Sequence, residues 1–229
     1  YEISLGLVGS EMCIRDRPIT LLTGPLEVNT YIMLGARAGE CFLVDPSDAA
    51  LVRDTMADRG VKPTHILLTH GHFDHILAVA ALQKEFGAKV CIHAEDAEAL
   101  YSKRASLSVF AGMEVPPCWA DVLLQGGETL DAAGFAVKVL HTPGHSKGSV
   151  CYLLERERMI FAGDTLFRLS VGRSDLAGGS ERELYESIAY TLFPLAGDYD
   201  VYPGHMRKTT LEFERQHNPV MRDWGAGRW

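Results

Sequence analysis

Four short apolar segments of the chain are each followed by histidine or aspartate, and this pattern constrains the fold more than any other feature. The segments are 65–69, 136–140, 159–162 and 200–202, and the polar residues that follow them are His70, His72, Asp74, His75, His145, Asp164 and His205. Loops after strands can bring residues that are distant in sequence to one place. We therefore expect a fold that gathers these side chains into a single site.

The densest cluster lies in "LLTHGHFDHI", residues 67–76. In an extended or turning loop, residues i and i+2 point the same way, so His70 and His72 can bind one cation. Asp74 and His75 stand where a helix is predicted to begin and can turn toward a second cation, while Gly71 allows a tight bend. Imidazole and carboxylate groups suit zinc, iron or manganese. The pattern predicts a metal site.

Composition narrows the class of protein. The chain has 229 residues, of which 47% are hydrophobic and 23% charged, as expected for a globular domain with one sizeable core. Its net charge of -8, without a run of lysine or arginine, argues against nucleic-acid and anionic-membrane partners. No apolar segment approaches the roughly 18 residues that a membrane-spanning helix needs. We expect a small-molecule substrate; the sequence does not predict the oligomeric state.

Cysteine usage predicts the compartment. None of the five cysteines falls in a C-x-x-C pair, and Cys41, Cys91 and Cys151 lie in apolar, strand-like runs. A free cysteine in such a run behaves as a small hydrophobic residue. This usage favours a reducing cytoplasm over a disulfide framework.

The first 17 residues differ in character from the rest. The stretch "LVGSEMCIRD", residues 7–16, reads like a translated sequencing adapter, and it lacks the basic region and cleavage site of a signal peptide. We expect residues 1–17 to be non-native and the functional domain to span residues 18–229.

From Pro18 onward, apolar strands alternate with helical patterns. Strands are predicted at 29–34, 41–45, 65–69, 89–93, 136–142, 149–155, 158–164 and 198–205. Helices are predicted at 47–59, 74–86, 180–192 and 208–218, with one more inside 94–125. Such an α/β pattern favours two packed sheets with helices outside.

Four motifs resemble the metal-binding motifs of the metallo-β-lactamase superfamily in order and spacing. They are "THGHFDH" (69–75), "HTPGHS" (141–146), "FAGDT" (161–165) and "YPGH" (202–205), and the resemblance extends from Pro18 to about Val220. Residues 163–180 and 201–219 are similar to the short, glyoxalase II-like (hydroxyacylglutathione hydrolase-like) metallo-hydrolases. The resemblance implies an αββα sandwich of two packed mixed sheets with outer helices.

The resemblance also implies a dinuclear site that holds two divalent ions, with Zn²⁺ expected first and iron or manganese as alternatives. His70, His72 and His145 would bind one ion and Asp74, His75 and His205 the other, with Asp164 bridging them. Two such ions lower the pKa of a shared water, so that hydroxide attacks an ester or thioester carbonyl. Asp74 and Asp164 would be the catalytic carboxylates. Thr69, His141 and Thr142 lie beside ligands in the sequence and are candidates to orient them by hydrogen bonds, with plain packing of the loops as the alternative role.

The substrate is less constrained than the chemistry. A thioester such as S-lactoylglutathione is the expected substrate, with Arg168, Arg173 and Ser174 as candidate substrate-binding residues in place of the usual lysine and tyrosine pattern. Arginine can bind a carboxylate, although Arg173 could instead pair with Asp175 and shape the loop. Met206 stands where the family pattern has glycine, a departure expected to alter the pocket wall.

Other functions stay open at this point. The nearest alternative is a persulfide dioxygenase that uses a single iron ion, because Gly172–Asp175 resembles a loop of that branch. A lactonase and a non-catalytic metal-binding module are further alternatives. The intact ligand set argues against the non-catalytic module.

Overall fold

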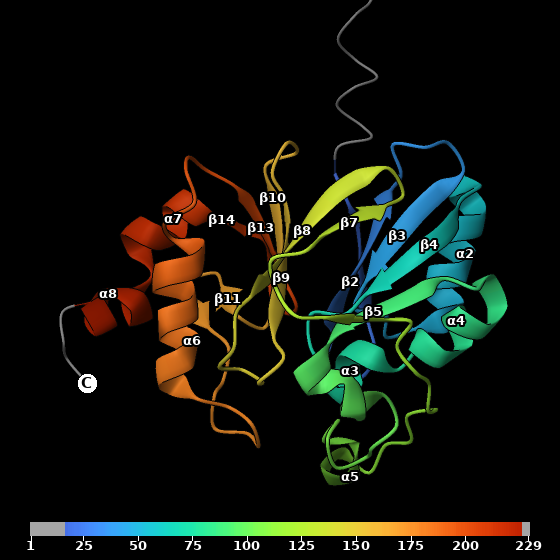
Figure 1. The fold of residues 1–229 in the computed structure, drawn as a ribbon, viewed down its shortest axis with the longest axis horizontal. Coiled ribbons are helices and arrows are strands. Elements are labelled where there is room, and N and C mark those ends of the chain that lie inside the picture. Colours follow the sequence, from blue (N-terminus) through green and yellow to red (C-terminus); the bar gives the residue numbers. More distant parts are fainter. Residues whose placement is uncertain (1–16, 226–229) are drawn as a thin grey trace, which may run out of the picture.

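The computed structural model describes residues 17–225, which form two six-stranded sheets packed face to face (Figure 1). The first sheet has the order β1 (Ile19–Thr23), β2 (Val28–Leu34), β3 (Glu40–Val44), β4 (Lys62–Leu67), β5 (Lys89–His93) and β6 (Val122–Leu124). The second has the order β14 (Thr209–Thr210), β13 (Asp200–Pro203), β10 (Met159–Gly163), β9 (Val150–Leu154), β8 (Phe135–His141) and β7 (Thr129–Ala132). A small hairpin, β11 (Leu166–Phe167) and β12 (Ser170–Val171), follows β10.

Both sheets are mixed. Strands β3 to β6 pair in parallel, whereas β1, β2 and β3 pair antiparallel. In the second sheet β10 and β13 are parallel and the other pairs are antiparallel. The carboxyl ends of parallel strands lie at one edge of a sheet, and this edge carries the histidine- and aspartate-rich loops.

Apolar side chains fill the space between the sheets and the space under the helices. The central layer contains Phe42, Phe161 and Tyr152, each fully buried between the two sheets. Helices α2 (Ala49–Arg59), α3 (Phe73–Ile76), α4 (Val79–Phe86) and η1 (Ala94–Leu100) contribute to a core on the outer face of the first sheet. Helices α6 (Glu181–Ser187), η2 (Ile188–Leu192), α7 (Leu211–His217) and α8 (Pro219–Gly225) cover the second sheet, and α5 (Ser108–Ala111) lies in the loop before β6 (Figure 1). The predicted αββα sandwich is confirmed.

Two local predictions were wrong. The helix predicted over 74–86 is two helices, because the chain turns at Leu77 and Ala78 and the Ala78 amide donates to the Pro46 carbonyl at 3.1 Å. Strand β4 ends at Leu67 rather than Thr69, because the Thr69 amide donates to the Asp45 side chain. Sequence patterns also missed the short strands β1, β6, β7, β11, β12 and β14. Strand β14 occupies the start of the helix predicted over 208–218, so that helix begins at Leu211.

Residues 1–16 lie outside the described part, so the non-native origin of residues 1–17 stays a prediction. Each helix within residues 17–225 is too short or too polar to span a bilayer.

A buried carboxylate on α7 connects this helix to strand β14 and to the turn between β11 and β12. Glu214 is fully buried and accepts hydrogen bonds from the Leu169 amide (2.9 Å), Thr209 Oγ1 (2.6 Å) and Asn218 Nδ2 (2.9 Å). Glu214→Ala leaves these donors without partners, so we expect it to lower the free energy of unfolding by about 3 kcal/mol. Urea denaturation measures the change. Glu212→Ala, on the exposed side of the same helix, is the control and should cost about 0.5 kcal/mol; equal losses would contradict the prediction.

Candidate metal centre

The loops at the carboxyl ends of the strands bring all seven predicted ligands to one place between the sheets. His70 and His72 follow β4, and Asp74 and His75 lie in the short helix α3. His145, Asp164 and His205 follow β8, β10 and β13. Four of the five histidines and Asp74 are buried, and His205 keeps 23% of its side chain exposed toward the cavity described below. Both sheets therefore contribute to the cluster.

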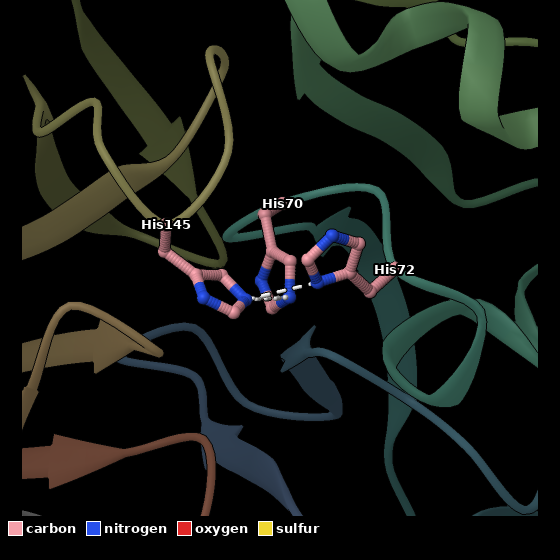
Figure 2. Close-up of side chains that lie close together, drawn as sticks. All are labelled: His70, His72 and His145. Atoms are coloured by element: carbon pink, nitrogen blue, oxygen red, sulfur yellow. Dashed lines mark hydrogen bonds between the residues drawn. The ribbon is translucent and has the colours of Figure 1, made fainter. Parts of the chain in front are cut away.

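Three histidines form the first group of candidate ligands. The ligand atoms of His70, His72 and His145 lie within 4.8 Å of one another. His145 Nε2 lies 3.2 Å from His70 Nε2 and 2.9 Å from His72 Nδ1, and the three rings converge on one point (Figure 2).

Hydrogen-bond polarity shows that lone pairs meet at this point. His145 Nδ1 lies 2.7 Å from the Arg173 carbonyl, which only accepts, so Nδ1 carries the proton. Thr69 Oγ1 donates to Asp45 Oδ2 at 2.6 Å, so it accepts from His70 Nδ1 at 3.0 Å. In neutral His70 and His145 the two Nε2 atoms are then both acceptors, although they face each other. A cation between them removes this repulsion.

The second group consists of Asp74, His75 and His205, with ligand atoms again within 4.8 Å of one another. Asp74 Oδ2 lies 3.3 Å from His205 Nε2 and 3.5 Å from His75 Nε2. Asp164 lies between the two groups, since its Oδ2 is 3.6 Å from both His145 Nε2 and His205 Nε2. Its other oxygen, Oδ1, is 3.6 Å from His75 Nε2.

The electrostatics of the two groups differ. Burial, reinforced by the neighbouring imidazoles, lowers the pKa of His70 well below its ordinary value and that of His72 to about 3, so both present neutral nitrogen. At His75 burial also lowers the pKa, but Asp74, Asp164 and Asp45 together raise it to about 10. Without a metal, a proton on His75 balances these carboxylates.

The second group thus attracts positive charge. Two buried polar atoms in or beside it also lack a hydrogen-bond partner in the described part of the protein. Within the described residues, His75 Nε2 and Asp164 Oδ1 are buried and have no hydrogen-bond partner. Gly204 leaves the space open, because a Cβ there would contact Asp164 Oδ1 and lie 2.7 Å from His75 Cε1. Orphaned buried atoms with converging nitrogen and carboxylate donors fit two divalent ions.

Asp45, at the end of β3, orients two of the histidines and was not predicted as a site residue. Its Oδ2 accepts from His75 Nδ1 at 3.0 Å and from Thr69 Oγ1, which in turn contacts His70. Its Oδ1 accepts from the Thr69 amide at 2.8 Å. The available signal was that Asp45, like the predicted ligands, directly follows an apolar strand.

We expect Asp45→Asn to weaken metal binding by about 10- to 100-fold, because asparagine has one acceptor oxygen and its NH₂ group would face either the Thr69 amide or the His75 and Thr69 Oγ1 donors. Competition with a chromogenic chelator measures the affinity. Asp48→Asn is the matched control: Asp48 caps α2 by accepting from the Ala50 and Leu51 amides, and asparagine caps equally well. Unchanged affinity in Asp45→Asn would show that Asp45 is not an orienting residue.

The other predicted orienting residues lie further from the ligands. Thr142 Oγ1 contacts Thr165 Oγ1 at 3.3 Å, and His141 Nε2 donates to the Lys147 carbonyl at 2.9 Å. The His141 ring also stacks on His93, with ring centroids 4.1 Å apart. Both side chains shape the loop that carries His145.

A cavity of about 880 Å³ opens beside the candidate ligands. His72, Asp74, His145, Asp164 and His205 line it, and we call this part of the lining the floor of the cavity. Of the predicted substrate-binding residues, Arg173 lines the cavity, but it pairs with Asp175 through two hydrogen bonds of 2.8 Å. Arg168 stacks on the Phe213 ring at 4.3 Å, and neither Arg168 nor Ser174 is among the lining residues.

Comparison with known proteins identifies the family. The family model described as "Metallo-beta-lactamase superfamily" matches residues 23–219. The chain is 32% identical over 200 residues to the probable metallo-hydrolase YqgX of Bacillus subtilis, with 86% of this chain and 94% of the relative covered. It is also 32% identical over 161 residues to the hydroxyacylglutathione hydrolase GloC of Haemophilus influenzae, with 68% and 74% covered.

Similarity to solved structures identifies the same superfamily. The B3 metallo-beta-lactamase BLEG-1 superposes with a TM-score of 0.85 at 35% identity, covering 90% of this chain and 99% of that one. TTHA1623, solved in a di-iron-bound form, gives 0.78 at 37% identity over 89% and 99%. ETHE1 from Myxococcus xanthus gives 0.74 at 29% identity over 89% and 83%. The chain belongs to the metallo-β-lactamase superfamily.

Proposed function

We propose that the protein is a dinuclear metal-dependent hydrolase of acyl thioesters. The observation that carries this proposal is the position of Asp164, whose Oδ2 lies 3.6 Å from a nitrogen of each candidate ligand group. A carboxylate placed in this way can bridge two ions. The di-iron form of TTHA1623 and the probable metallo-hydrolase YqgX support the same chemistry.

The seven candidate ligands would form two groups, one for each ion. His70, His72 and His145 would hold one ion and Asp74, His75 and His205 the other, with Asp164 shared. When bound, two such ions supply Lewis acidity and lower the pKa of water toward neutrality. Zn²⁺ is our first choice, and iron and manganese suit the same donors.

Asp74 has a second role in this proposal. Burial opposes its ionisation, but His75 and His205 hold the pKa of the carboxyl below its ordinary value, so Asp74 is charged at neutral pH. It lines the cavity, where it can accept a hydrogen bond from the attacking water. The water oxygen bonds to the thioester carbon, the C–S bond breaks, and the products are a carboxylic acid and a thiol. A thiolate leaves readily, so the reaction needs no dedicated general acid.

The similarity to GloC, a hydroxyacylglutathione hydrolase, makes S-lactoylglutathione the first substrate to test. Metal analysis of the purified protein is combined with hydrolysis of a panel of thioesters, esters and lactones. Two ions per chain with thioester hydrolysis are the expected result. Two ions without turnover of any of these compounds would contradict the proposal and favour a non-catalytic metal-binding module.

A persulfide dioxygenase with one iron ion is the alternative. The Gly172–Asp175 loop that suggested it lies beside the cluster, where the Arg173 carbonyl accepts from His145. The complete second ligand group favours two ions. One iron per chain with oxygen uptake on glutathione persulfide would establish the alternative.

The cellular context remains predicted from the sequence. The four described cysteines, Cys41, Cys91, Cys118 and Cys151, are buried thiols, and we infer a reducing compartment such as the cytoplasm. The expectation of no nucleic-acid or membrane partner rests on the charge balance.

A further inference from the structure

Part of the wall of the cavity beside the candidate ligands is apolar and open to solvent. Leu26, Phe110 and Met206 line it and are 52%, 79% and 57% exposed. They come from the turn between β1 and β2, from α5 and from the loop after β13. Single exposed apolar residues are ordinary, but three from separate segments around one cavity mark a binding surface. We call these three residues the apolar lip.

Met206 occupies its place at the cost of backbone strain. Its φ is 67°, in the left-handed region that favours glycine. Asn29 holds the loop in this conformation, because its Nδ2 donates to the Met206 carbonyl at 2.7 Å and to the Pro203 carbonyl at 3.0 Å. A strained residue directly after a candidate ligand, with its side chain lining the cavity, indicates a functional role for that side chain.

The charged residues that line this cavity do not match glutathione, which has two carboxylates. Among the described lining residues Arg173 is the sole lysine or arginine, and Asp175 neutralises it. A neighbouring cavity of about 360 Å³ shares His72 and Ala177 with the first, and its charged lining residues are Glu95, Asp96, Glu98, Arg104 and Lys147. Three carboxylates against two cations leave no positive surplus there.

We propose that the apolar lip binds an apolar group of the substrate, so that the preferred substrates are thioesters with an apolar chain on the acyl or the thiol side. This inference rests on the proposed hydrolase function. The candidate ligands would position the scissile carbonyl at the floor of the cavity, and the apolar group would lie along Leu26, Phe110 and Met206. Burial of methylene groups against these side chains then supplies the binding free energy that glutathione recognition would otherwise supply.

Two substrate series test the proposal on the metal-loaded protein. The acyl series holds glutathione constant and compares lactoyl, butanoyl, hexanoyl and octanoyl thioesters. The thiol series holds acetyl constant and compares glutathione with propanethiol, pentanethiol and thiophenol. We expect kcat/KM to rise by about two- to fourfold per added methylene in at least one series. The series that rises identifies which side of the scissile bond contacts the lip.

The variant Met206→Gly separates the role of the side chain from folding. Glycine accepts a φ of 67° without strain, so the variant should melt no lower than the parent. We expect kcat/KM for the longest member of the rising series to fall by about five- to tenfold, mainly through KM. Leu123→Ser is the control, because Leu123 is 55% exposed on β6 and lines neither this cavity nor the adjoining one that Met206 also lines.

The outcomes distinguish failure of the proposed hydrolase function from failure of the apolar-lip proposal. No hydrolysis of any ester or thioester by protein with two ions would overturn the proposed function. Hydrolysis with rates independent of chain length in both series, or an unchanged chain-length dependence in Met206→Gly, would overturn the apolar lip and leave the hydrolase intact.

Discussion

Asp164→Ala is expected to abolish hydrolysis and to leave at most one metal ion per chain. Asp164 Oδ2 lies 3.6 Å from both His145 Nε2 and His205 Nε2, so the substitution removes a donor from both ligand groups. Loss of a residue that only orients a ligand costs about 10- to 100-fold, and loss of a shared ligand costs more, so activity should fall below about 1% of the parent. Activity and metal content are measured on the same preparation.

The control for this variant is Asp58→Asn, which alters an exposed carboxylate in the last turn of α2. It should keep two ions and the parent rate. Full activity of Asp164→Ala with two bound ions would show that Asp164 does not bridge, and the dinuclear mechanism would have to be abandoned.

Removal of metal by a chelator is expected to lower the melting temperature by about 10–20 °C. An ion at 100 times its dissociation constant stabilises the folded state by about 2.7 kcal/mol, two ions contribute about twice that, and 1 kcal/mol shifts the melting temperature of a chain of this length by about 2–4 °C. The metal-free cluster is poorly satisfied, since lone pairs of His70 and His145 face each other at 3.2 Å and two buried atoms have no partner. Differential scanning calorimetry measures the shift.

Restoration of the metal identifies the ion. Zinc, iron and manganese are added separately to the metal-free protein, and the ion that restores both melting temperature and hydrolysis is the functional one. In Asp164→Ala the chelator should shift the melting temperature by less than in the parent. Equal melting temperatures before and after chelation of the parent would mean that the cluster holds no metal.

The sequence was sufficient to predict the layered fold and the seven-residue cluster. Both depend on local features: apolar strands about five residues long, and polar residues directly after them. An imidazole or a carboxylate at the end of a strand can be recognised as a potential metal ligand without knowledge of its surroundings. The helix prediction over 74–86 failed for a long-range reason, because the turn at Leu77 and Ala78 depends on a hydrogen bond from Ala78 to Pro46, more than 30 residues away in the chain.

Only the tertiary structure decided how the ligands are oriented and what surrounds them. Asp45 acts on His75 across 30 positions of sequence, and Arg168, predicted to bind substrate, stacks instead on Phe213. Leu26, Phe110 and Met206 are ordinary apolar residues in the sequence and become one surface only where their three loops meet. Side-chain chemistry therefore determined that the chain can bind metal, whereas long-range packing, which leaves no periodic signal in the sequence, determined the shape and polarity of the cavity where a substrate would bind.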